Sequence, residues 1–229
     1  MALRDHRREP WAGDGNDRMR RPLRGRAHAP AHRHGLAWPF PQRAATVAAL
    51  IDAGADVNAR FVGRHAETPL HWAASSDDLE VLDALLDAGA DIDASGSVID
   101  GGTALADAVA FGQWNAARRL MERRARSTLR QAAALGLLER VDEFFAAADQ
   151  PAADDVTNAF WCACRGGQLA AAEYLLDRGA DRDCIGHDGL SPIDAARRSN
   201  AGDVVDWLSR RGARSHAGLE QNGPDDQTP

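Results

Sequence analysis

The sequence predicts an all-α solenoid of about five stacked helix-turn-helix repeats with short hairpin loops, flanked by disordered termini. A glycine at the end of an apolar helical stripe recurs at Gly54, Gly89, Gly179 and Gly212, with first and last intervals of 35 and 33 residues. The stripes have a spacing near 3.6, which is typical of helices that pack on one face. Apolar residues make up 44% and charged residues 27%, as in ordinary globular chains.

The clearest repeat unit spans residues 68–94. Thr68 can cap a first helix that begins at Pro69, where the missing N–H of proline costs nothing. The second helix has an apolar stripe and ends at Gly89, because glycine adopts a left-handed backbone more easily than any residue with a Cβ. One such helix pair cannot cover its own apolar faces. Neighbouring pairs must therefore stack to form a core.

This unit resembles the ankyrin-repeat family, in which two short helices are paired with a projecting hairpin. The matching residues are Thr68, Pro69, Leu70, His71, Ala73, Ala74, Leu85, Leu86, Gly89, Ala90 and Asp91, with looser copies from Thr103, Thr128, Asn158 and Ser191. The resemblance predicts an ankyrin-repeat domain over residues 44–215, with repeats near 44–60, 65–95, 100–126, 127–150, 157–186 and 187–214. The first repeat is partial, because Pro39 and Pro41 would break its first helix.

Two repeats depart from the pattern. Arg124 replaces the helix-ending glycine of one repeat and is expected to adopt a positive φ, and the hairpin after it is missing. The next repeat has Ala148 at that position and continues through a loop to Thr157. We expect a seam over residues 124–157 that opens at a lower free energy than the flanking repeats. Simple decay of the repeat pattern is the alternative.

The two termini differ in charge from the predicted domain. Residues 1–43 carry ten Arg against four acidic residues, whereas residues 44–229 carry 17 Arg against 30 acidic residues. Residues 1–43 and 216–229 are expected to be disordered. The Arg-rich arm could contact nucleic acid or another anionic partner, although it has no recognition fold and is joined to an acidic domain. The chain lacks an apolar leader and apolar stretches of roughly 18 residues, so the expectation is a cytoplasmic protein without membrane contact.

No enzyme motif or cofactor site is recognised in the sequence. The one constellation that could support zinc or redox chemistry is Cys162, Cys164, Cys184 and His187, but Cys164 falls on a small core position of the repeat. His28, His32 and His34 lie close together in a low-complexity segment without a rigid frame. We therefore expect no catalytic, cofactor or metal site, and three free thiols.

The candidate functional surface is the concave face, which is formed by variable positions of the first helices. These positions are Trp72, Ser75, Ser76, Asp107, Phe111, Gln131, Leu135 and Arg165, with the hairpin tips at Phe61 and Ile99 as a further candidate. Trp72, Phe111 and Leu135 would form an apolar strip, unless the missing hairpin lets them pack on one another. The resemblance implies a non-catalytic module that binds a protein partner and is expected to be monomeric.

Overall fold

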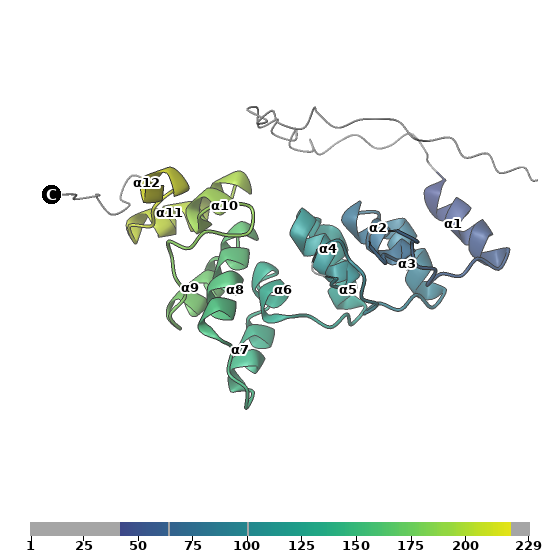
Figure 1. Ribbon diagram of the computed structural model, residues 1–229, viewed down its shortest axis with the longest axis horizontal. Coiled ribbons are helices and arrows are strands. Elements are labelled where there is room, and N and C mark those ends of the chain that lie inside the picture. The colour runs from purple at the N-terminus through teal and green to yellow at the C-terminus, as the bar shows by residue number, and fades with distance from the viewer. Residues whose placement is uncertain (1–41, 64, 100, 221–229) are drawn as a thin grey trace, which may run out of the picture. The chain divides into compact units, whose positions relative to one another are not determined.

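The structure is a computed structural model that describes residues 42–63, 65–99 and 101–220. These residues form helices and connecting loops, with no strand among them (Figure 1). The helices are α1 (Arg43–Asp52), α2 (Pro69–Ser75), α3 (Leu79–Asp87), α4 (Ala104–Phe111), α5 (Trp114–Glu122), α6 (Leu129–Ala134), α7 (Leu138–Ala146), α8 (Ala153–Arg165), α9 (Leu169–Leu176), α10 (Pro192–Arg198), α11 (Gly202–Arg210) and α12 (His216–Glu220). From α2 to α11 they form five helix pairs, which confirms the predicted all-α solenoid.

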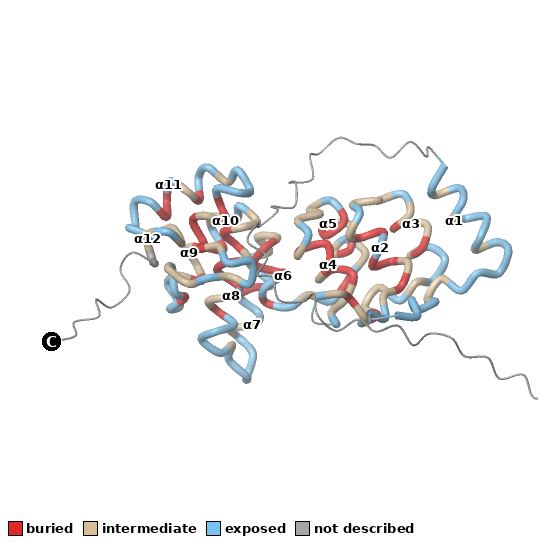
Figure 2. Tube along the Cα trace, turned by 45° about the horizontal axis from the view of Figure 1, so that its top comes forward, coloured by how far each residue is buried: buried red, intermediate tan, exposed pale blue. Residues whose placement is uncertain are grey.

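Four of the five first helices begin after a side chain suited to capping, whereas α8 begins after Ala152. Thr68, Thr103, Thr128 and Ser191 precede α2, α4, α6 and α10, each in an extended conformation. These first helices carry much of the buried surface, as the red segments of the burial trace show (Figure 2). By contrast, α1 has no buried residue and lacks a partner helix within the described chain. It lies at the N-terminal end of the stack and packs against α3 through Val47 and Ile51.

A buried ring links successive repeats in both halves of the solenoid. His71 Nδ1 accepts from the backbone N–H of Thr68 at 3.1 Å, so Nε2 carries the proton and donates to the Gly102 carbonyl at 3.3 Å. At the corresponding position of α8, Trp161 Nε1 donates to the Leu190 carbonyl at 2.9 Å. Tryptophan therefore makes in the fourth helix pair the link that histidine makes in the first.

The hydrophobic core is divided into two clusters near the predicted seam. The N-terminal cluster includes Leu82 and Leu105, and the C-terminal cluster includes Phe160 and Leu208. Residues from α6 and α8 take part in both clusters. As predicted, no hairpin projects where residues 123–128 join α5 to α6. Residues 147–152 join α7 to α8 by an equally short loop, whereas the connections from α3 to α4 and from α9 to α10 are longer. Whether this seam opens first remains a prediction.

Two boundaries differ from those expected. Helix α8 begins at Ala153, so the loop after α7 ends earlier than predicted, and Val156 is buried in the C-terminal cluster. Asp154 and Asp155 in its first turn favour this longer helix, because acidic groups stabilise a helix N-terminus. The predicted disordered tail begins with the short helix α12. The expectations for residues 1–41 and 221–229, including the three histidines of the arm, lie outside the described residues.

Arg124 confirms the backbone expectation, because its φ is 69° in the position that glycine occupies after α3 and α9. Its side chain is exposed. A left-handed backbone costs a residue with a Cβ about 1–2 kcal/mol, and the extra entropy of glycine offsets about half of that. Arg124→Gly is therefore expected to raise the free energy of unfolding by about 1 kcal/mol, measured by chemical denaturation.

The matched control is Arg118→Gly, which makes the same change at an exposed position inside α5. It is expected to lower the free energy of unfolding by about 1 kcal/mol, because glycine is a poor helix residue. A loss of stability in both variants would contradict a strained backbone at Arg124.

Candidate functional site

Two aromatic side chains, one in the first hairpin between α1 and α2 and one in α2, lie exposed side by side. The rings of Phe61 and Trp72 are 5.8 Å apart, and about half of each side chain is exposed. Trp72 Nε1 donates to Glu67 Oε2 at 3.1 Å, which orients the indole. The Phe61 backbone N–H donates to the Glu67 carbonyl at 2.8 Å and closes the hairpin. Both rings are thus held in place while their faces remain accessible.

The first hairpin is joined at its base to the second hairpin, which connects α3 to α4. Arg60 Nη1 donates to the carbonyls of Ala66 at 3.1 Å and Ser95 at 2.6 Å. Gly96 follows with a φ of 130°, and a Cβ there would lie 2.3 Å from the Ala66 carbonyl oxygen. This close backbone approach requires glycine. The junction therefore fixes the base of the hairpin that carries Ile99.

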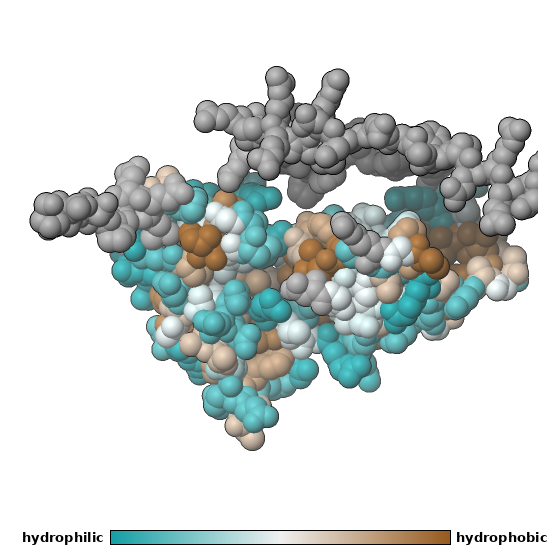
Figure 3. All heavy atoms as spheres, viewed as in Figure 1, coloured by the Kyte–Doolittle hydropathy of each residue, from teal (hydrophilic) through white to brown (hydrophobic). Residues whose placement is uncertain are grey.

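Further large apolar side chains are exposed in the same part of the chain. We define the N-terminal apolar surface as Phe61, Val62, Trp72, Ile99 and Phe111. Val62 is 96% exposed and was not among the predicted residues. Its position next to Phe61 in the sequence of the hairpin could have indicated its exposure. The space-filling view shows apolar groups among hydrophilic ones over the α1 to α4 part (Figure 3). The Ser75 side chain donates to the Trp72 carbonyl, and Ser76 is exposed at the end of α2.

Two of the predicted surface residues are buried, which corrects their assignment. Asp107 is fully buried beneath the second hairpin, where Ser97 Oγ donates to its Oδ1 at 2.5 Å and accepts from the Ile99 backbone N–H at 2.8 Å. Gln131 is buried because its Oε1 accepts from the Thr128 backbone N–H at 2.8 Å and caps α6. Asp107 therefore positions the hairpin tip, and Gln131 stabilises a helix.

The Asp107 carboxyl predicts a pH dependence of stability. Burial raises its pKa above the usual value of 3.8, and the Ser97 hydrogen bond and the nearby His71 and His65 oppose that shift while Glu67 adds to it. A raised pKa in the folded state means that stability declines as the pH rises from about 4 through the folded pKa. Asp107→Asn is expected to remove this decline and raise the melting temperature at pH 7. If Asp107→Asn and the unmodified chain had the same pH profile of melting temperature between pH 4 and 7, this role of the Asp107 carboxyl would be contradicted.

The predicted concave-face residues of the α6 and α8 repeats, Leu135 and Arg165, are partly buried by contacts with other repeats. Leu135 is partly buried against the N-terminal cluster. Arg165, at the end of α8, donates to the carbonyls of Val109 at 3.0 Å and Ala110 at 2.6 Å near the end of α4. Desolvation lowers the pKa of this guanidinium, which is partly buried. Leu135 thus packs toward the N-terminal repeats, and Arg165 links α8 to α4 past the α6–α7 repeat. The exposed apolar residues predicted for this face lie on the N-terminal side of the seam.

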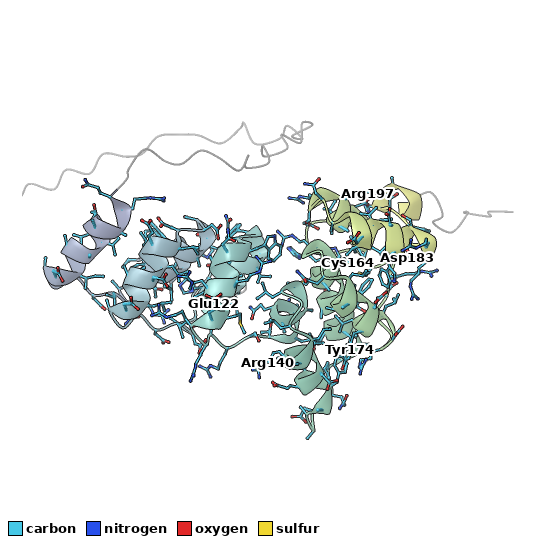
Figure 4. All side chains as sticks on the ribbon, turned by 180° about the vertical axis from the view of Figure 1, so that it is seen from behind. Glu122, Arg140, Cys164, Tyr174, Asp183 and Arg197 are labelled. Atoms are coloured by element: carbon cyan, nitrogen blue, oxygen red, sulfur yellow. The ribbon has the colours of Figure 1, made fainter. Side chains whose placement is uncertain are left out.

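The three cysteines are free thiols. Cys164 is fully buried among the C-terminal helices (Figure 4). Burial raises the pKa of Cys162 to about 11 and that of Cys184 to about 12, so these thiols are neutral at physiological pH. His187 packs its ring against Trp161, with ring centroids 4.9 Å apart. Among the described residues, no group of three or more His, Cys, Asp or Glu side chains could hold a metal ion.

Comparison with known proteins agrees with the repeat architecture. The family model described as ankyrin repeats (3 copies) matches residues 40–131. The chain is also 40% identical over 62 residues to the ankyrin repeat and KH domain-containing protein mask-1 of Caenorhabditis elegans. That match covers 25% of this chain and 2% of the nematode protein. Within the described residues, no helix combines the length and apolar character needed to cross a bilayer.

Proposed function

Because the chain belongs to the ankyrin-repeat family, whose repeats are generally protein-interaction modules, we propose that it binds a protein partner without catalysing a reaction. We place the contact on the N-terminal apolar surface. The observation that carries this proposal is the exposed pair of Phe61 and Trp72 on a hydrogen-bonded hairpin. Exposed aromatic side chains on a rigid frame contribute a large share of interface energy and lose little entropy on binding.

The remaining exposed residues extend the same surface across two repeats. Phe111 ends α4 and is about half exposed, and Ile99 lies in the hairpin that precedes α4. Apolar side chains gathered in one part of a surface are typical of partner-binding sites.

The test is the double variant Trp72→Ala with Phe111→Ala, used in the full chain. It is expected to leave the melting temperature nearly unchanged, since both side chains are half exposed. Capture of the partners that the unmodified chain retains from a lysate should weaken at least roughly tenfold, which is about 1.4 kcal/mol. Quantitative mass spectrometry of the captured proteins provides the measurement.

The matched control is Leu138→Ala with Ile185→Ala, which removes exposed apolar side chains from the C-terminal half. Capture by this control should be unchanged. A large loss of stability in the Trp72 and Phe111 variant would assign both residues to the core. Unchanged capture by a stable variant would remove Trp72 and Phe111 from the contact and leave only the hairpin tips at Phe61 and Ile99 as the candidate part of this surface.

A further inference from the structure

The charge of the solenoid is distributed unevenly along its repeats. Residues 44–112 contain two Arg against twelve acidic residues, a net charge of −10, whereas residues 113–215 contain 15 of each and are neutral. All members of the N-terminal apolar surface lie within residues 44–112. The N-terminal apolar surface therefore lies in the part of the chain that carries nearly all of the net charge of the repeats.

Many of these acidic groups are available to a partner. Asp78, Asp83, Asp87 and Asp93 form ion pairs with arginines, and Asp83 and Asp87 are bridged by Arg119 and Arg123 from α5. Within the described chain, six other acidic residues of this segment form no ion pair and are exposed or partly exposed. They are Asp52, Asp56, Glu67, Asp77, Glu80 and Asp91. The guanidinium of Arg60 is occupied by two backbone carbonyls.

Charge and apolar side chains meet at Glu67. One of its carboxylate oxygens accepts from the indole of Trp72, and the other makes no hydrogen bond within the described residues. A basic side chain approaching this carboxylate would also reach the faces of Trp72 and Phe61, where a cation is attracted to the ring. At physiological ionic strength charges are screened over about 8 Å, so groups at this distance or closer still steer a partner.

We infer that the N-terminal apolar surface receives a cationic protein segment in which arginine or lysine alternates with apolar side chains. This inference rests on the proposed function and specifies the chemistry of its partner. Nucleic acid and acidic peptides would be repelled by the acidic groups of this segment that form no ion pair, and a purely apolar segment would leave these groups without counter-charges.

The experiment selects peptides from a phage-displayed library of random sequences, about 16 residues long, on the immobilised full chain. The same library is selected in parallel on the Phe61→Ala, Trp72→Ala variant. Sequences enriched on the unmodified chain over the variant should be rich in Arg, Lys and aromatic or aliphatic residues and poor in Asp and Glu. The affinity of a synthetic copy should fall at least roughly tenfold when its basic residues are replaced by Glu.

Two charge variants of the protein distinguish a local contact with the acidic groups near Trp72 from a general effect of the net charge. Glu67→Gln with Asp91→Asn should weaken binding of the selected peptide several-fold. Asp203→Asn with Asp206→Asn, at exposed positions of α11, removes the same charge and should have little effect. Equal weakening by both pairs would overturn a local contact with the N-terminal surface.

The outcomes separate this inference from the function it rests on. Neutral or acidic peptides that require Trp72 would overturn the cationic partner while supporting protein binding at this surface. Basic peptides that bind the Phe61→Ala, Trp72→Ala variant equally well would overturn the placement of the contact on the N-terminal apolar surface. A selection that enriches nothing over this variant would overturn both.

Discussion

Trp161→Ala is expected to lower the free energy of unfolding by about 3–5 kcal/mol, as measured by chemical denaturation. The indole is 2% exposed and donates a hydrogen bond to Leu190 across the repeat boundary. It also fits closely against Gly186, where a Cβ would lie 2.3 Å from the ring. The substitution therefore removes core packing and one of the two hydrogen bonds that the Leu190 carbonyl accepts, the other coming from the Gly186 backbone N–H.

Trp72→Ala is the matched control, because it removes the same side chain from the neighbouring register position of α2. It should change the free energy of unfolding by about 0.5 kcal/mol or less, since Trp72 is 53% exposed. Comparable losses in the two variants would show that Trp72 belongs to the core and would remove it from the proposed binding surface.

Arg165→Ala is expected to lower the free energy of unfolding by about 2 kcal/mol, because it removes two charge-assisted hydrogen bonds to carbonyls at the end of α4, and such bonds contribute more than neutral ones. The side chain reaches from α8 to Val109 and Ala110 of α4, past the repeat formed by α6 and α7. Hydrogen exchange of amides in α4 and α6 should accelerate in this variant, whereas exchange in α11 should not.

Arg198→Ala provides the control for charge, because Arg198 occupies the same register position in the last repeat and forms an exposed ion pair with Asp188. Its expected cost is below about 1 kcal/mol. Arg165→Lys keeps the positive charge but loses the planar guanidinium, so its cost in free energy of unfolding should lie between those of Arg165→Ala and Arg198→Ala. Equal costs for Arg165→Ala and Arg198→Ala would contradict a specific link across the seam.

Local sequence rules predicted the repeat architecture because each repeat encodes its own helix ends. The helix-ending glycines and the positive φ of Arg124 follow from position within one unit. The burial of side chains on the concave face could not be predicted from the position within one repeat, because it depends on the side chains and loops of neighbouring repeats. Asp107 shares the register position of Trp72 but is covered by Ser97 from the second hairpin. The start of α8 was missed because residues 147–152 lack the turn motif that marks other repeats.

The candidate site was predictable only in part for a related reason. The register identified Trp72 and Phe111 as variable positions, and both are exposed. It does not specify how a hairpin folds, so the contact of Phe61 with Trp72 and the exposure of Val62 required the structure. Arg165 stood on a variable position as well, but its reach to α4 spans 55 residues of sequence.

The division of the hydrophobic core has a consequence for cooperativity. In a stack of repeats, a unit communicates with distant units through the interfaces between neighbours, so the weakest interface sets how far order propagates. Here the N-terminal and C-terminal clusters are each built from several helix pairs, and few buried residues join them. Thermal unfolding is therefore expected to have a van't Hoff enthalpy smaller than its calorimetric enthalpy, with a partly folded chain that retains one cluster.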